Sequence, residues 1–280
     1  MTTPQSISHR CENAQCPRAR IAWLWRWRRP PGIRLNDAWY CSLECFEQGA
    51  LELFSQLNLK ASRGRAIRYR LPLGLLLLSK GLISAEHLQD ALKAQKESQK
   101  GRLGDWLRQH GILTEEQLTG ALGVQWGLPV FHLAQSSGFA ECAAMAPVHL
   151  MEASRMALVH YMPTSRNLYV AFSDGIDFAA LRALEQMIEC STQPCVIGET
   201  EMEEALDAMR RMPRPSETVL DGDCAPKSLA TTTREWAESN KADQVRAVVA
   251  SESLWVRLES SSLTGHLLFK LPEAVPELVL

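Results

Sequence analysis

The feature that most constrains this chain is an internal repeat with a period of 30 residues. Residues 72–95 align with residues 102–125 without a gap, and about ten positions carry the same type of residue in both copies. Repetition at a fixed period indicates two copies of one supersecondary unit. The two copies are expected to bury their leucines against each other.

Each copy of the repeat carries start and stop signals for two helices. Gly81 and Gly111 stand where a first, short helix is expected to end. Ser84 and Thr114 follow as N-caps of a second helix, which has leucines at helical spacing. The pattern therefore predicts a helical bundle of two tandem repeats over residues 66–135.

The repeated motif begins with Arg-Leu-Gly. Two aliphatic residues, a glycine and two further aliphatic residues follow, and the motif ends with Leu-x3-Leu-x2-Gln. It resembles the MshEN domain, found at the N-terminus of the GspE-like ATPases of type II secretion and type IV pili. In that family each motif contributes to a binding site for cyclic di-GMP. The resemblance implies that the ligand-binding residues here are Arg70, Leu73, Gly74, Leu77, Leu88, Leu92, Gln95, Arg102, Leu103, Gly104, Leu107, Leu118, Leu122 and Gln125.

The residues of the motif suit such a ligand, which has two phosphates and two guanines. Arginine pairs with a phosphate or stacks on a base, and glutamine hydrogen-bonds a guanine edge. Two positions depart from the family pattern: Pro72 replaces the first arginine, although Arg70 is near, and Arg108 replaces an aliphatic residue. The alternative is a bundle without a ligand, in which the leucines form the core and Gln95 and Gln125 lie at the surface.

A four-cysteine pattern occupies the first part of the chain. Cys11-x4-Cys16 and Cys41-x3-Cys45 are separated by 24 residues, as in zinc sites where each pair forms one knuckle. The segment Ile21–Leu35 turns at Pro30-Pro31-Gly32 and suits a hairpin, and helical spacing follows Cys45. The order resembles a treble-clef zinc finger over residues 1–62, with structural zinc on the four thiolates. Four unligated buried thiols are the alternative.

The rest of the chain is expected to hold three further segments. Residues 139–212 predict an α/β subdomain, in which Ser173-Asp174 is read as a turn or a helix cap. Cys142, Cys190, Cys195 and Cys224 are read as packing thiols. Residues 213–234 are rich in Pro, Ser, Thr and Asp and predict a linker. Residues 235–280 predict a small C-terminal α+β or β unit. The expected fold class is α+β.

The amino-acid composition excludes few classes of function. The chain of 280 residues has 46% hydrophobic and 22% charged residues and a net charge of -2. Residues 1–70 are basic, with twelve Lys/Arg against five Asp/Glu. No segment reaches the roughly 18–20 apolar residues of a membrane span. We see no export signal, and so expect a cytoplasmic bacterial protein with reduced cysteines.

Catalytic motifs are absent from the sequence. It contains no G-x4-G-K-[ST] phosphate-binding loop, which a secretion ATPase requires, and no other catalytic constellation in a credible context. The first interpretation is therefore a non-catalytic adaptor that responds to cyclic di-GMP and has a protein partner in secretion or pilus machinery. The second is a protein-interaction module that has lost the ligand. The third is a nucleic-acid-binding protein that uses Arg26, Arg28, Arg29 and Arg34 of the basic finger.

Overall fold

The structure is a computed structural model that describes residues 10–17, 32–57, 59, 71–98, 101–135, 139–261 and 263–272. The chain divides into two compact units. The repeat unit is Gly64–Pro213, and the sheet unit combines Met1–Arg63 with Arg214–Leu280. Both units mix helices with a sheet, which confirms the α+β fold class.

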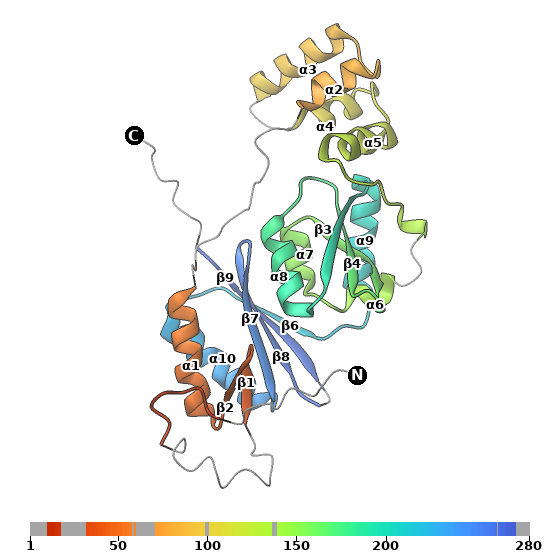
Figure 1. Ribbon diagram of the computed structural model, residues 1–280. Coiled ribbons are helices and arrows are strands. Elements are labelled where there is room, and N and C mark those ends of the chain that lie inside the picture. The colour runs from red at the N-terminus through yellow and green to blue at the C-terminus, as the bar shows by residue number, and fades with distance from the viewer. Residues whose placement is uncertain are drawn as a thin grey trace. The chain divides into compact units, whose positions relative to one another are not determined.

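The repeat unit begins with four helices that correspond to the two repeats (Figure 1). They are α2 (Leu73–Ser79), α3 (Ala85–Ser98), α4 (Leu103–Gln109) and α5 (Glu115–Trp126). Gly81 and Gly111 have φ angles of 67° and 69°, the left-handed conformation that ends a helix at glycine. Thr114 caps α5 through a reciprocal pair of hydrogen bonds with Gln117. The predicted helix pairs are confirmed.

An α/β part completes the repeat unit. A single-turn 3-10 helix (Leu133–Gln135) and two short helices, α6 (Phe139–Ala143) and α7 (Val148–Ala153), lead into β3 (Met156–Met162) and β4 (Asn167–Phe172). They are followed by α8 (Phe178–Ile188), β5 (Ser191–Val196) and α9 (Glu199–Arg211). The strand order is β3-β4-β5, antiparallel and then parallel. Residues 129–131 hydrogen-bond to Val196 of β5, and they thereby tie the chain after α5 to this sheet.

The sheet unit brings together two distant parts of the sequence. Its N-terminal elements are β1 (Ile33–Leu35), β2 (Ala38–Tyr40) and α1 (Leu43–Gln56). Its C-terminal elements are β6 (Ser216–Leu220), α10 (Pro226–Ser239), β7 (Gln244–Ala250), β8 (Ser253–Glu259) and β9 (Thr264–Lys270). The six strands form one sheet in the order β2-β1-β7-β8-β9-β6, and α1 packs beside α10 (Figure 1). β1 joins the sheet through parallel pairing with β7.

The sheet unit differs from the sequence prediction in two ways. Residues 213–234 were expected to be a linker, but they contain β6 and residues 226–234 of α10. β6 is an edge strand paired only with β9, so its polar composition is tolerated there. Residues 235–280 were expected to form a separate unit, but their strands share one hydrophobic core with α1, where Phe46 and Phe54 are fully buried.

Candidate functional site

The four predicted metal-binding cysteines lie together in the sheet unit. The sulfur atoms of Cys11, Cys16, Cys41 and Cys45 all lie within 4.8 Å of one another. The Sγ atoms of Cys16 and Cys41 are 3.5 Å apart, and those of Cys41 and Cys45 are 4.0 Å apart. Cys11, Cys16 and Cys45 are buried.

Local hydrogen bonds explain how the two cysteine pairs meet. In the first knuckle, the Cys16 N–H donates to the Asn13 carbonyl over 3.0 Å, which closes a turn between the two cysteines. In the second, Ser42 caps α1 by accepting from the Cys45 N–H over 3.3 Å, so Cys41 and Cys45 flank the start of the helix. A hairpin, β1–β2, lies between the knuckles and turns at Asn36-Asp37, whereas the sequence predicted a hairpin over Ile21–Leu35 with its turn at Pro30-Pro31-Gly32; residues 18–31 lie outside the described residues.

The geometry of the cluster fits a tetrahedral metal ion. Four sulfurs at about 2.3 Å from a zinc ion are about 3.8 Å apart, close to the measured separations. Burial raises the pKa of Cys11 and Cys41, so burial alone keeps these thiols protonated. A bound cation would supply the missing stabilisation of the thiolates. The cluster can therefore hold a metal such as zinc.

The other four cysteines have different surroundings. Burial raises the pKa of Cys142 to about 11, that of Cys190 to about 11 and that of Cys195 to about 12. Cys224, whose pKa burial also raises, donates from its thiol to the Lys270 carbonyl over 3.1 Å. These thiols are therefore weak nucleophiles, as expected for packing residues.

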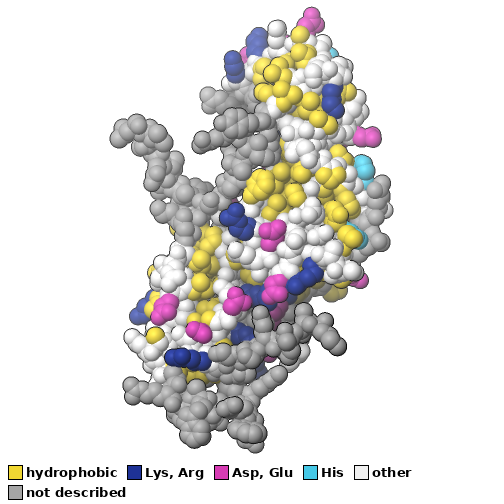
Figure 2. Space-filling view, viewed as in Figure 1, with side chains coloured by type: hydrophobic (Ala, Val, Ile, Leu, Met, Phe, Trp, Pro, Cys, Tyr) yellow, Lys and Arg dark blue, Asp and Glu magenta, His cyan; other side chains and the backbone are white. Residues whose placement is uncertain are grey.

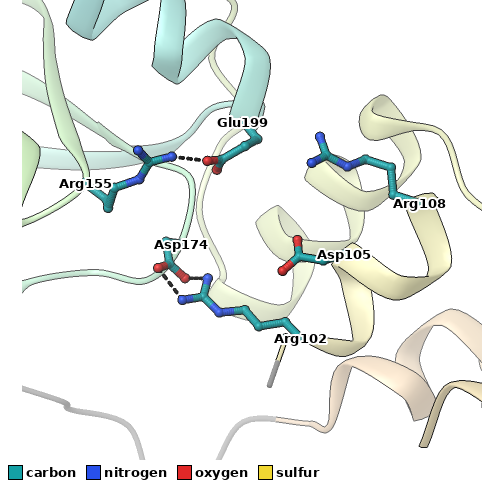
Figure 3. A pocket seen from close by; sticks show the side chains of 7 residues that line it. Arg102, Asp105, Arg108, Arg155, Asp174 and Glu199 are labelled. Carbon is teal, nitrogen blue, oxygen red and sulfur yellow. Dashed lines mark hydrogen bonds and ion pairs between the residues drawn. The ribbon is translucent and has the colours of Figure 1, made fainter. Parts of the chain in front are cut away.

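Two adjoining pockets lie in the repeat unit, between the bundle and the α/β part. The smaller, of about 90 Å³, is lined by five of the predicted ligand-binding residues: Leu73, Arg102, Gly104, Leu118 and Leu122. The larger is open and has a volume of about 620 Å³ (Figure 3). Its lining consists of Gly101, Arg102, Asp105, Arg108, Arg155, Asp174 and Glu199. The first repeat thus contributes Leu73 and the second contributes an arginine, a glycine and two leucines.

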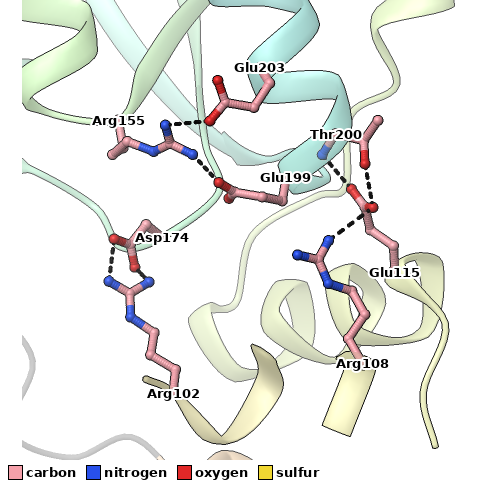
Figure 4. Close-up of polar contacts among 8 residues, drawn as sticks. All are labelled: Arg102, Arg108, Glu115, Arg155, Asp174, Glu199, Thr200 and Glu203. Carbon is pink, nitrogen blue, oxygen red and sulfur yellow. Dashed lines mark hydrogen bonds and ion pairs between the residues drawn. The ribbon is translucent and has the colours of Figure 1, made fainter. Parts of the chain in front are cut away.

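Each arginine of the larger pocket is paired with a carboxylate (Figure 4). Arg102 forms an ion pair with Asp174, and Arg155 pairs with Glu199 and with Glu203. Arg108 donates to Glu115 over 3.1 Å. Arg102 is 61% exposed, so its ion pair is open to solvent and to a competing anion.

Glu115 links the bundle to the α/β part. Its carboxylate accepts two hydrogen bonds of 2.6 Å from Thr200, one from the backbone N–H and one from the hydroxyl. Burial by itself would raise the pKa of Glu115, but the bonds from Thr200 and the charge of Arg108 outweigh burial and lower it. Glu115 therefore remains ionised at neutral pH and fixes α5 against the start of α9.

The two glutamines of the motif hold the repeats together. The Gln95 side-chain amide donates to the Gly101 carbonyl over 3.1 Å, and that of Gln125 donates to the Leu71 carbonyl over 2.7 Å. Leu71 and Gly101 are equivalent positions, 30 residues apart, directly before the first motif residue of each repeat. Each glutamine thus binds the opposite repeat, a function that the surface-residue interpretation did not include.

The structure also shows the surroundings of the other residues of the predicted ligand motif. Leu77 and Leu107 are fully buried in the bundle core. Gly74 and Gly104 are buried under Leu88 and Leu118, and a Cβ atom at Gly74 would lie 2.6 Å from a methyl carbon of Leu88. Leu103 is half-buried against the core, whereas Leu92 is 43% exposed. Arg70 lies outside the described residues, as do Arg26, Arg28 and Arg29.

Sequence reasoning missed part of this site. Asp174 was read as a turn or cap residue and does lie in a bend after β4, although the N-cap of α8 is Asp177. The sequence did not reveal that the Asp174 side chain pairs with Arg102 across 72 positions. Arg155 and Glu199 gave no signal in the sequence. Only Arg108 did, because it departs from the aliphatic pattern of the motif.

Comparisons with known proteins give a partial match. No family model matches the sequence, and no curated protein matches it. A solved structure of MshE with cdg is 30% identical over 50% of this chain and 99% of that chain, with a TM-score of 0.43. Half of this chain is similar in structure to the N-terminal domains of MshE and XpsE.

The two XpsE structures are more distant in sequence. One is 16% identical and covers 48% of this chain and 91% of that chain, with a TM-score of 0.36. The other is 17% identical and covers 50% and 98%, with a TM-score of 0.30. Both are structures of the N-terminal domain of XpsE. None of the helices in the described ranges combines the length and hydrophobicity that a bilayer span requires.

Proposed function

We propose that this chain is a non-catalytic regulatory or adaptor protein that binds cyclic di-GMP in the pockets of its repeat unit. One observation carries the proposal: residues of the ligand motif from both repeats line the same small pocket. Leu73, Leu118 and Leu122 offer an apolar surface there, and Arg102 lies at its edge beside the larger pocket. The repeat motif implies the ligand, the compound abbreviated cdg in the MshE structure.

The polar groups of the pocket suit a guanine nucleotide. A guanidinium donates to the O6 and N7 acceptors of guanine or to a phosphate, and a carboxylate accepts from the N–H groups on the opposite edge of the base. Arg102 and Asp174 both line the larger pocket, where they form an ion pair with each other that a ligand can replace (Figure 3). Ser173 also lines the small pocket, and its hydroxyl is buried without a hydrogen-bond partner among the described residues.

The site has no arrangement for chemistry on the ligand. Asp174, Glu199 and Glu115 are each paired with an arginine, and the residues of the site serve binding and orientation. We propose that the four-cysteine cluster holds a structural zinc ion, which stabilises the sheet unit rather than takes part in a reaction. Zinc fits because the sulfur separations match a tetrahedral site closed by four protein ligands.

Calorimetric titration of the full chain with cyclic di-GMP tests the proposal. The expected result is saturable binding with micromolar or tighter affinity, and GMP at the same concentration should bind much more weakly. Absence of heat and of any thermal stabilisation at high micromolar cyclic di-GMP would refute a sensor function.

A protein-interaction module without a ligand is the second candidate, and exposed leucines favour it. Hydrophobic side chains reach the surface of the bundle (Figure 2), where Leu71 and Leu75 are each 51% exposed and Leu78 is 37% exposed. Leu75 and Leu78 are three residues apart on α2 and therefore lie on one face of that helix, while Leu71 directly precedes its N-cap, Pro72. A secretion or pilus protein is the partner class that the motif implies. This candidate would be wrong if a secretion or pilus protein still co-purified with the Leu75→Asp variant, and did so only when cyclic di-GMP was present.

A further inference from the structure

The two repeats differ in where they carry positive charge. Pro72 in the first repeat is equivalent to Arg102 in the second, and Leu78 is equivalent to Arg108. The first repeat has therefore lost its motif arginine at position 72, while α4 of the second has gained one. We propose that Arg108 is a second ligand-contacting residue that replaces the arginine missing at position 72. This inference rests on the proposed binding of cyclic di-GMP.

The geometry supports a shared function for the two arginines of α4. Arg102 and Arg108 line both pockets, six residues apart on one helix. Six residues correspond to about 9 Å along a helix axis, so the two guanidinium groups can reach different parts of one dinucleotide. Figure 3 shows both side chains at the same pocket. The Arg108 side chain is 33% exposed and remains accessible to a ligand.

The charge balance of the larger pocket gives Arg108 a specific importance. Its lining has three arginines, at positions 102, 108 and 155, against three carboxylates, at positions 105, 174 and 199. With leucine at position 108, as in the first repeat, the lining would have two positive charges against three negative ones. A dianionic ligand would then approach a negatively charged wall. Arg108 removes that repulsion as well as supplying donors.

Glu115 holds Arg108 in place without using all of its donors. One guanidinium nitrogen, Nη1, donates to Glu115, which Thr200 fixes in turn (Figure 4). A guanidinium has five N–H groups, so most of them stay available to a phosphate or a base. A charged side chain that is already oriented loses less conformational entropy when the ligand binds.

The test is a calorimetric titration of the full chain with cyclic di-GMP in four proteins: wild type, Arg108→Leu, Arg108→Lys and Glu115→Gln. Arg108→Leu installs the residue of the first repeat and should weaken binding about tenfold or more, as expected for a lost charge-assisted contact. Arg108→Lys keeps the charge and should bind with intermediate affinity. Glu115→Gln removes the carboxylate that orients Arg108 but keeps the charge of Arg108, and its amide oxygen can still accept from Thr200, so it should weaken binding much less than Arg108→Leu.

Adding Pro72→Arg to Arg108→Leu gives a further readout, because a motif arginine restored to the first repeat should recover part of the lost affinity. Circular dichroism should show that each variant is folded. Equal affinity of wild type and Arg108→Leu would overturn the inference and leave the proposed function intact. An equal loss in Glu115→Gln and Arg108→Leu would also overturn it, because Arg108 would then act only by bracing the fold. A wild-type protein that binds no cyclic di-GMP would overturn both.

Discussion

Replacement of Cys41 by serine is expected to unfold the sheet unit well beyond the cysteine cluster. Cys41 is the cysteine of the cluster whose sulfur lies 3.5 Å from that of Cys16 and 4.0 Å from that of Cys45, so it joins the two knuckles. It also directly precedes Ser42, the N-cap of α1. The buried face of α1 contributes Phe46 and Phe54 to the same core as β7–β9.

The magnitude follows from the coupling of metal binding to folding. A structural zinc ion contributes about 10–16 kcal/mol in small zinc modules at neutral pH. Whole domains are stable by only about 5–15 kcal/mol. Even a fraction of the zinc contribution is therefore enough to unfold a unit whose core includes the helix that the metal anchors. The repeat unit contains no residue of the cluster and should stay folded.

Hydrogen exchange followed by mass spectrometry measures the protection of backbone amides in each of the two units separately. In Cys41→Ser, peptides from α1, β7, β8 and β9 should exchange rapidly, while peptides from α2–α5 should keep wild-type protection. Elemental analysis should give about one zinc per wild-type chain and less in the variant. Cys224→Ser is the matched control, because it removes a thiol of the same unit and serine can still donate to the Lys270 carbonyl.

Two results would refute this reasoning. The first is a wild-type protein without metal whose four thiols react freely in the native state. The second is loss of protection confined to residues 10–17 and 38–45, which would show that β7–β9 fold without the cluster.

Three further predictions concern the repeat unit. Leu107→Ala should lower the free energy of unfolding, measured in urea, by about 2–5 kcal/mol, because Leu107 is fully buried. Leu122→Ala changes a pocket residue, so it should lower the free energy of unfolding less but weaken the binding of cyclic di-GMP, measured by titration. Gln125→Ala should cost about 0.5–1.5 kcal/mol in urea unfolding through loss of its bond to the Leu71 carbonyl, and unchanged stability would contradict that bond. The lowered pKa of Glu115 stabilises the fold above the unfolded-state carboxyl pKa of about 4.3, and this stabilisation is lost as the pH falls through the lower folded-state value. Glu115→Gln should therefore flatten the acid side of the stability–pH curve, and an unchanged curve would refute the assignment.

The sequence predicted local structure well where the signal was local. Gly81, Gly111 and Thr114 mark helix ends by the conformations and hydrogen bonds of a few neighbouring residues, so their pattern could be read directly. The cysteine pairs could be matched to each other because metal geometry limits their spacing. In both cases the physical constraint lies within a short stretch of sequence or in one well-defined site.

Pairing between distant segments could not be predicted in the same way. Leu35 pairs with Val245 of β7, 210 residues away, and neither residue carries a sign of its partner. The contact of Arg102 with Asp174 depends on how the bundle meets the α/β part, which no local pattern encodes. Residues 213–234 were interpreted as a linker because they are polar. They include the edge strand β6, which tolerates polar residues because it pairs with β9 on one side and lies at the edge of the sheet on the other.

A calorimetric comparison of two arginine variants tests most directly whether Arg102 binds cyclic di-GMP in the repeat unit, as we propose. Arg102→Ala removes a charge-assisted contact worth about 1.5–3 kcal/mol, so affinity should fall about tenfold to a hundredfold. Arg211→Ala, which removes a surface arginine that is 81% exposed at the end of α9, should bind like wild type. Equal affinity of Arg102→Ala and wild type, or no binding by wild type, would contradict the claim.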